Sequence, residues 1–142
     1  MRQRLDPKDF CPAAGQGSLG IETRVNDTNT IAALAFLDDQ ATRFSVTAER
    51  AALAALGGGC QVPIGIHCRT ITGAECGPAV SCWEIYGVVA HPHTGKTVRG
   101  YHRVPQAYAD AAALGKEIAA ILTDAGAGEL LADVVAAPGG AA

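Results

Sequence analysis

Aromatic residues and long apolar runs are scarce in this sequence. Phe, Trp and Tyr account for 5% of the 142 residues, although 49% of the residues are hydrophobic. This composition predicts a globular protein whose core is built from small side chains. No segment approaches the roughly 20 apolar residues that cross a bilayer, and residues 1–10 lack the apolar stretch of a secretion signal. We therefore expect a soluble, cytoplasmic protein without a membrane partner.

The sequence also lacks any run of basic residues. It contains 11 Lys and Arg against 14 Asp and Glu, which gives a formal net charge of -3 at pH 7. Proteins that bind DNA or RNA neutralise phosphates with clustered Lys and Arg side chains. We therefore expect no nucleic-acid partner.

Zinc-binding spacings such as CxxC are absent, although five cysteines are present: Cys11, Cys60, Cys68, Cys76 and Cys82. Their odd number, in a chain without an export signal, disfavours a disulfide framework, so we interpret them as thiols. A thiol or metal protein that uses some of these cysteines with His67, His91 and His93 stays an alternative. We expect no metal, because cysteines in strands are usually small core residues.

Hydrophobic periodicity predicts an α+β fold. Alternating patterns predict strands over residues 64–70, 79–90 and 97–104, and these strands are expected to form a three-stranded antiparallel sheet. Apolar residues at helical spacing predict helices over residues 42–56, 105–125 and 129–135, packed on one face of the sheet. In the first of these helices, the Glu49–Arg50 pair is expected on the solvent side.

The segment before this domain is not expected to form a core of its own. Residues 1–18 are irregular, residues 19–25 predict a short strand, and residues 31–38 predict a helix. One strand and one helix cannot bury their apolar faces without further partners. We therefore expect residues 1–41 to be a strand-helix remnant of preceding domains, residues 42–136 to form the main domain, and residues 137–142 to be a disordered tail.

Three consecutive glycines precede Cys60, and Pro63 follows it. A thiol that carries a bulky, growing product needs a mobile tether and free space around its sulfur, and neighbouring glycines provide both. The alternative is an ordinary helix end followed by a buried cysteine, which is the more common reason for such a pattern. Spacing alone favours this alternative.

Four segments together resemble the hydroxymethylbilane synthase (porphobilinogen deaminase) family. They are PAAGQGSLGIE at residues 12–22, VTAERA at 46–51, GGCQVPIG at 58–65 and AGAGELLA at 125–132. The resemblance implies a transferase of tetrapyrrole (heme) biosynthesis that condenses four porphobilinogen molecules into hydroxymethylbilane. It further implies that Cys60 carries a dipyrromethane cofactor through a thioether and that Gln16 borders the active-site cleft.

The resemblance covers only the C-terminal part of that family. Its members have three domains, and the first two supply the catalytic acid and most arginines that bind substrate carboxylates. No catalytic residue is therefore assigned in this chain, and Asp38 and Asp39 are expected to be surface charges at a helix end.

The resemblance also implies the partners of this chain. They are porphobilinogen and the growing polypyrrole in the full enzyme, with a complementary N-terminal half or a second copy of the chain as a protein partner. The alternative function is a non-catalytic module that retains the third-domain fold and binds a partner chain or no ligand.

Overall fold

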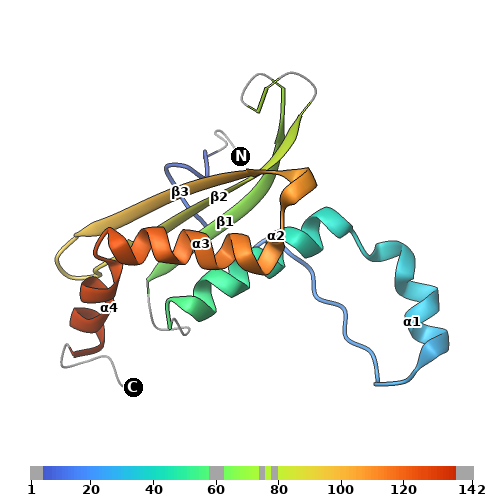
Figure 1. Cartoon of the computed structure of the whole chain (residues 1–142). Coiled ribbons are helices and arrows are strands. Elements are labelled where there is room, and N and C mark those ends of the chain that lie inside the picture. The colour runs from blue at the N-terminus through green and yellow to red at the C-terminus, as the bar shows by residue number, and fades with distance from the viewer. Residues whose placement is uncertain (1–4, 58–62, 74–75, 78–79, 137–142) are drawn as a thin grey trace.

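Three strands form one antiparallel sheet in the computed structural model, which describes residues 5–57, 63–73, 76–77 and 80–136. The sheet order is β1 (Ile64–Thr72), β2 (Ser81–Ala90) and β3 (Thr97–Pro105), as Figure 1 shows. The register pairs Ile66 with Gly87, and Gly87 in turn with Gly100. The predicted three-stranded antiparallel sheet is confirmed.

Two long helices, α2 (Gln40–Ala55) and α3 (Ala111–Asp124), pack on the same face of this sheet (Figure 1). A further helix, α4 (Ala127–Ala136), follows α3 directly and contacts β2. The α+β fold with helices on one face is therefore confirmed. None of the helices within the described residues has the length and apolar content needed to cross a membrane.

The core lies between the helices and the inner face of the sheet, the face toward α2 and α3. It consists of aliphatic side chains and small residues that are almost fully buried: Ala48, Ala52, Ile66, Ile85, Val89, Leu114, Ile118 and Leu122. Burial of each large aliphatic side chain stabilises the fold by roughly 2 kcal/mol. The alanines of α2 allow its backbone to approach α3 closely, as the composition predicts.

Acidic side chains begin the helices by accepting hydrogen bonds from backbone N–H groups of the first turn. The Asp39 carboxylate accepts from Thr42 N at 2.7 Å, and that of Asp110 accepts from Ala113 N at 2.7 Å. Such caps satisfy donors that have no partner within the helix. Asp38 forms an ion pair with Arg43. Asp38 and Asp39 both lie exposed at the start of α2, as expected.

Two predicted elements differ from the structure. Residues 19–25 form no strand, because no neighbouring strand of the described chain offers them hydrogen bonds. The helix predicted over 105–125 is interrupted: a 3-10 helix, η2 (Gln106–Tyr108), precedes an extended Asp110, and α3 begins only at Ala111. Tyr108 is consequently 84% exposed instead of facing the sheet.

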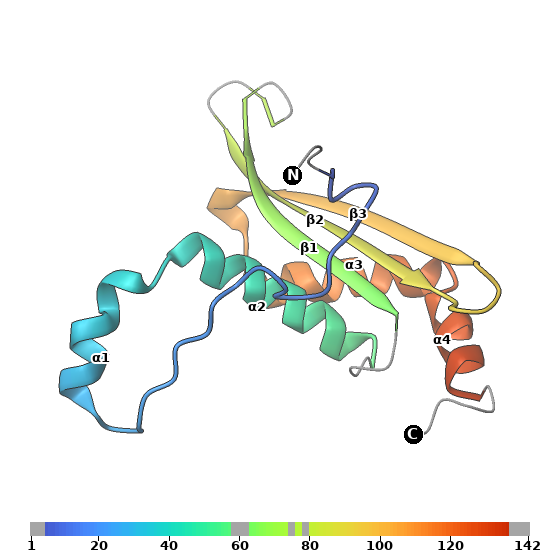
Figure 2. The same cartoon turned by 180° about the vertical axis from the view of Figure 1, so that it is seen from behind.

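The segment between residues 19 and 37 extends away from the sheet (Figures 1 and 2). Its helix α1 (Thr28–Leu34) and the following 3-10 helix η1 (Ala35–Leu37) contain no buried residue. Several large apolar side chains are exposed here: Leu19 (96%), Ile21 (54%), Val25 (88%), Ile31 (48%), Phe36 (81%) and Leu37 (50%). As predicted, this segment does not bury its apolar residues against the rest of the described chain.

Residues 8–12, in contrast to residues 19–37, pack against the sheet. They cross its outer face, the face away from α2 and α3 (Figure 2). The Arg99 guanidinium donates to the backbone oxygens of Lys8 at 2.9 Å and Asp9 at 3.3 Å. The Lys8 ammonium lies 5.8 Å from the centre of the Tyr86 ring. The N-terminal part of the chain is thus attached to the sheet.

Gly115 of α3 is packed tightly against α2, which leads to a prediction. A Cβ atom at this position would lie 2.2 Å from the Ala48 backbone oxygen and 2.7 Å from Ala51 Cβ. We expect Gly115→Ala to lower the free energy of unfolding by about 3 kcal/mol, because overpacking forces the helices apart. Urea unfolding measures this change.

The matched control is Gly128→Ala in α4, where the nearest atom to an added Cβ is Thr123 Cγ2 at 4.0 Å. This variant should be neutral or more stable by up to about 1 kcal/mol, because alanine favours a helix. Equal effects of the two substitutions would contradict the packing assigned to Gly115.

Candidate functional site

Cys60 lies outside the described residues, in the connection between α2 and β1. Both ends of this connection are well defined. The Leu56 N–H donates to Ala52 O, and Gly57 ends α2 with a φ of 67°, a backbone conformation that glycine adopts without strain. This is the helix end predicted from the glycine. Ile64, which begins β1, is buried in the core.

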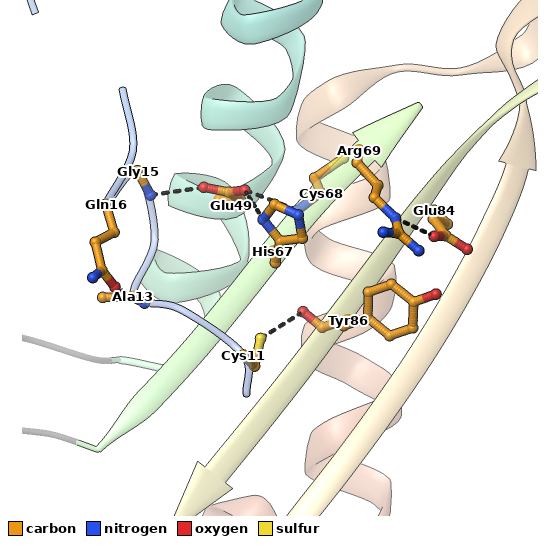
Figure 3. Close-up of polar contacts among 10 residues, drawn as sticks. All are labelled: Cys11, Ala13, Gly15, Gln16, Glu49, His67, Cys68, Arg69, Glu84 and Tyr86. Atoms are coloured by element: carbon orange, nitrogen blue, oxygen red, sulfur yellow. Dashed lines mark hydrogen bonds and ion pairs between the residues drawn. The ribbon is translucent and has the colours of Figure 1, made fainter. Parts of the chain in front are cut away.

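The segment that contains Gln16 packs beside the start of β1. The Pro12 carbonyl oxygen accepts from Ile66 N at 3.0 Å. A Cβ atom on Gly65 would lie only 2.7 Å from the Cys11 carbonyl oxygen, so the two backbones touch. The Cys11 thiol also donates to Tyr86 O at 3.8 Å (Figure 3). Residues 11–16 therefore run alongside the strand that follows the Cys60 connection.

Glu49 joins this segment to α2 and β1 (Figure 3). One carboxylate oxygen accepts from Gly15 N at 2.7 Å, and the other accepts from Cys68 N at 2.8 Å. The residue is 5% exposed, so the expectation that it faces solvent is wrong, whereas its neighbour Arg50 is exposed. Glu49 is buried because two backbone N–H groups would otherwise lack acceptors: one on the edge strand β1 and one on the N-terminal segment.

A groove of about 570 Å³ lies between residues 12–18, α2 and β1. Its polar lining includes Gln16, Ser45, Glu49, His67 and Arg69. The Gln16 side chain is exposed, and its amide oxygen accepts from Ala13 N at 3.0 Å. Its amide nitrogen makes no hydrogen bond to the described residues and is therefore a free donor for a ligand in the groove.

The two thiols beside this groove have raised pKa values. Burial, followed by the nearby Glu49 charge, raises the pKa of Cys11 to about 11 and that of Cys68 to about 12. Both thiols therefore stay protonated near neutral pH, and a protonated thiol is a poor nucleophile. Burial likewise lowers the pKa of His67, although the carboxylate of Glu49, 3.7 Å from its Nδ1, opposes the effect. His67 is accordingly a neutral imidazole near pH 7.

A second buried carboxylate, Glu84, lies on the outer face of the sheet. It is 1% exposed and accepts from Arg69 Nε at 2.5 Å and from the Tyr101 hydroxyl at 3.3 Å. Burial is the largest single effect on the pKa of Glu84 and would raise it. The hydrogen bond and charge of Arg69, with the Tyr86 hydroxyl and the Lys8 charge, together hold this pKa below its ordinary value. The Arg69 guanidinium thus forms an ion pair with Glu84.

The residues considered for a metal are distributed over the fold. Cys68 points to the inner face of β1 and packs in the core, whereas His91 and His93 lie in the β2–β3 turn. There the His91 Nδ1 accepts from the backbone N–H groups of His93 and Thr94, both at 3.2 Å. Within the described ranges, no three His, Cys, Asp or Glu side chains gather in a way that could hold a metal ion.

Sequence comparisons identify relatives of this chain. The family described as "Porphobilinogen deaminase, C-terminal domain" matches residues 43–124. A porphobilinogen deaminase of Chromobacterium violaceum is 41% identical over 134 residues, which cover 94% of this chain and 40% of that protein. A porphobilinogen deaminase of Trichlorobacter lovleyi is 42% identical over 130 residues, which cover 92% of this chain and 38% of that protein. The chain therefore spans about two fifths of the length of these relatives.

We expect the two hydrogen bonds of Glu49 to contribute measurably to stability. Glu49→Gln keeps the shape of the side chain, but its amide presents one oxygen and one NH₂ group to two backbone donors. We expect the free energy of unfolding to fall by about 2 to 3 kcal/mol, because a buried N–H loses its charged acceptor. Urea unfolding measures this loss. Arg50→Gln on the exposed side of the same helix is the control and should change stability by less than about 0.5 kcal/mol.

The lowered pKa of Glu84 generates a second prediction. Because its folded-state pKa lies below the ordinary value of 4.5, its ionised form stabilises the protein above pH 4.5. This stabilisation is lost as the pH falls below 4.5 and through the folded-state pKa. We therefore expect the stability difference between the wild type and Glu84→Gln to shrink on acidification.

Urea unfolding at a series of pH values measures this difference. Glu22→Gln, which changes an exposed carboxylate, is the control. A difference between wild type and Glu84→Gln that stays constant from neutral to acidic pH would contradict the assignment.

Proposed function

We propose that Cys60 carries the dipyrromethane cofactor of a porphobilinogen deaminase. The premise is that this chain belongs to the porphobilinogen deaminase family and contains its C-terminal domain. In this proposal the sulfur of Cys60 forms a thioether with the cofactor. The complete enzyme then condenses four porphobilinogen molecules into hydroxymethylbilane. The chain contributes the attachment point and one side of the binding groove.

The observation that carries the proposal is the arrangement around the α2–β1 connection. The connection starts at the end of α2 and finishes at the buried Ile64, so both of its ends are held by the core. Residues 11–16 pack directly beside the strand that follows it. This supports a role for Gln16 next to a group carried by Cys60.

The other described thiols support Cys60 by contrast. Burial raises the pKa values of Cys11, Cys68 and Cys76, so all three thiols are mainly protonated and attack slowly near neutral pH. Cys82 is 3% exposed in the central strand and offers no space for a bulky adduct. Cys60, which follows three glycines and lies within the family match, is the thiol best suited to attachment.

The described residues fit a role in holding the cofactor but not in completing the reaction. When attached, dipyrromethane supplies a free pyrrole end to which porphobilinogen units are added with loss of ammonia. The Gln16 amide nitrogen offers a donor to a carboxylate or carbonyl oxygen of a ligand in the groove. Glu49 holds the backbone next to Gln16 and thereby fixes the position of that donor.

The groove lacks the charges that the reaction needs. Substrate carboxylates require cations, and a developing positive charge requires a carboxylate held in position. Arg69 is the one Lys or Arg side chain among the described residues that line the groove, and it pairs with Glu84. The carboxylate of Glu49 is occupied by two backbone N–H groups. We therefore propose that the chain alone does not convert porphobilinogen.

We propose that the cations and the positioned carboxylate come from the remaining part of a porphobilinogen deaminase. The chain spans about two fifths of the length of its relatives, and residues 19–37 expose large apolar side chains, including Leu19, Val25 and Phe36. Exposed apolar surface of this kind favours association with another polypeptide. A second copy of the chain is the alternative occupant of this surface.

Cofactor attachment and turnover provide the test. The purified chain is incubated with porphobilinogen, alone and with the N-terminal three fifths of the Chromobacterium violaceum relative. We expect porphobilinogen loss and a dipyrromethane mass on Cys60 only in the mixture. Cys60→Ala should abolish both, whereas Cys76→Ser, which removes a thiol elsewhere, should retain both.

Two other outcomes separate the alternatives. Turnover by the chain alone that depends on Cys60 would contradict the proposed need for a second part. Formation of a stable complex without any mass on Cys60 would instead favour a non-catalytic module that binds a partner chain.

A further inference from the structure

Cys76 and Cys82 meet at one end of the β1–β2 hairpin. Cys82 lies on the outer face of β2, opposite Ile71 of β1, and is 3% exposed. The Cys76 thiol donates to the Ile71 carbonyl oxygen at 3.6 Å. Because Ile71 is the cross-strand partner of Cys82, this hydrogen bond brings the Cys76 sulfur next to Cys82.

The two thiols lie close together. The neighbouring Cys82 contributes to the raised pKa of Cys76, which agrees with this closeness. Both thiols are free, Cys76 being half-buried and Cys82 buried. A thiol bonded to the cross-strand partner of a second cysteine lies near the arrangement that a disulfide requires.

We propose that Cys76 and Cys82 form a dithiol site that reacts with small disulfides, such as oxidised glutathione, and closes to an intramolecular disulfide. This site is separate from the proposed role of Cys60. Cys82 lies on the outer face of the sheet, whereas the groove beside Gln16 lies between the N-terminal segment, α2 and the edge strand β1.

The reaction has two exchange steps. The more exposed Cys76 loses its proton to solvent, and its thiolate attacks one sulfur of the small disulfide and expels the other as a thiolate. Cys82 then loses its proton and attacks the Cys76 sulfur of the mixed disulfide, which expels the second small thiolate. The two cysteines are oxidised by two electrons, and the small disulfide is reduced to two thiols, each of which takes up one proton.

The surroundings set the rate of the first step. Burial and the neighbouring Cys82 raise the pKa of Cys76 to about 11, although the charge of Arg103 opposes this rise. Only a small fraction of Cys76 is thiolate near neutral pH, so closure is slow there. Below this pKa the rate should increase about tenfold for each pH unit, in parallel with the thiolate fraction.

The sequence allows the Cys76–Cys82 disulfide to be measured directly in one tryptic peptide. Trypsin cleaves after Arg69 and Lys96 and at no position between them, and the resulting peptide contains Cys76 and Cys82 as its only cysteines. The folded chain is treated with oxidised glutathione, the free thiols are blocked with N-ethylmaleimide in denaturant, and the peptide mass is determined. We expect a peptide that is lighter by two hydrogens and carries no label. Dithiothreitol before blocking should restore two labels.

Variants and an unfolded control identify the source of the reactivity. Cys82→Ser should stop at the first step, with one glutathione retained on Cys76. Cys76→Ala should leave the buried Cys82 reduced and labelled only after unfolding. In guanidinium the ratio of closed to glutathionylated peptide should fall several-fold, because the fold no longer holds the thiols together.

Three results would overturn the proposal. The first is a wild-type peptide that carries two labels after oxidation at alkaline pH. The second is a peptide that retains glutathione on Cys76 beside a free Cys82. The third is a ratio of closed to glutathionylated peptide that is the same in folded and unfolded protein. The wild-type measurements decide the question even if a variant fails to fold.

Discussion

The carboxylate of Glu49 accepts hydrogen bonds from backbone amides that are 34 residues before it and 19 residues after it in the sequence. This buried charge joins the N-terminal segment, α2 and the edge strand β1. A charge of this kind is stable in the interior only when donors satisfy it, so each of the three elements requires the others. The groove and the position of Gln16 depend on this contact, together with the hydrogen bond from Ile66 N to Pro12 O that holds the preceding residues beside β1.

Small residues allow the helices and the sheet around Glu49 to pack closely. Gly115 and the alanines of α2 bring the two long helices together, while Gly87 and Gly100 let Leu122 of α3 approach the sheet. With larger side chains at these positions the helices would lie farther from the sheet. The low aromatic content of the sequence therefore reflects close backbone packing.

The sequence predicted the strands and most helices because each has a local pattern, including caps and the glycine that ends α2. It did not predict the burial of Glu49, because helical spacing describes one face of α2 and contains no information on a distant amide at Gly15. The available signal was the VTAERA segment, which carries the family resemblance and contains Glu49. The strand predicted at residues 19–25 was also wrong because local pattern contains no information on distant partners. A strand needs a neighbouring strand, and the described chain offers none.

Hydrogen exchange at the Gly15 backbone amide tests most directly whether Glu49 holds the N-terminal segment on the domain. We expect this amide to exchange slowly in the native protein, at a rate close to that of the Cys68 amide, which shares the same carboxylate. In Glu49→Gln the exchange at Gly15 should become much faster. A Gly15 amide that exchanges in the wild type as fast as that of the exposed Gly17 would show that Glu49 does not hold the N-terminal segment on the domain.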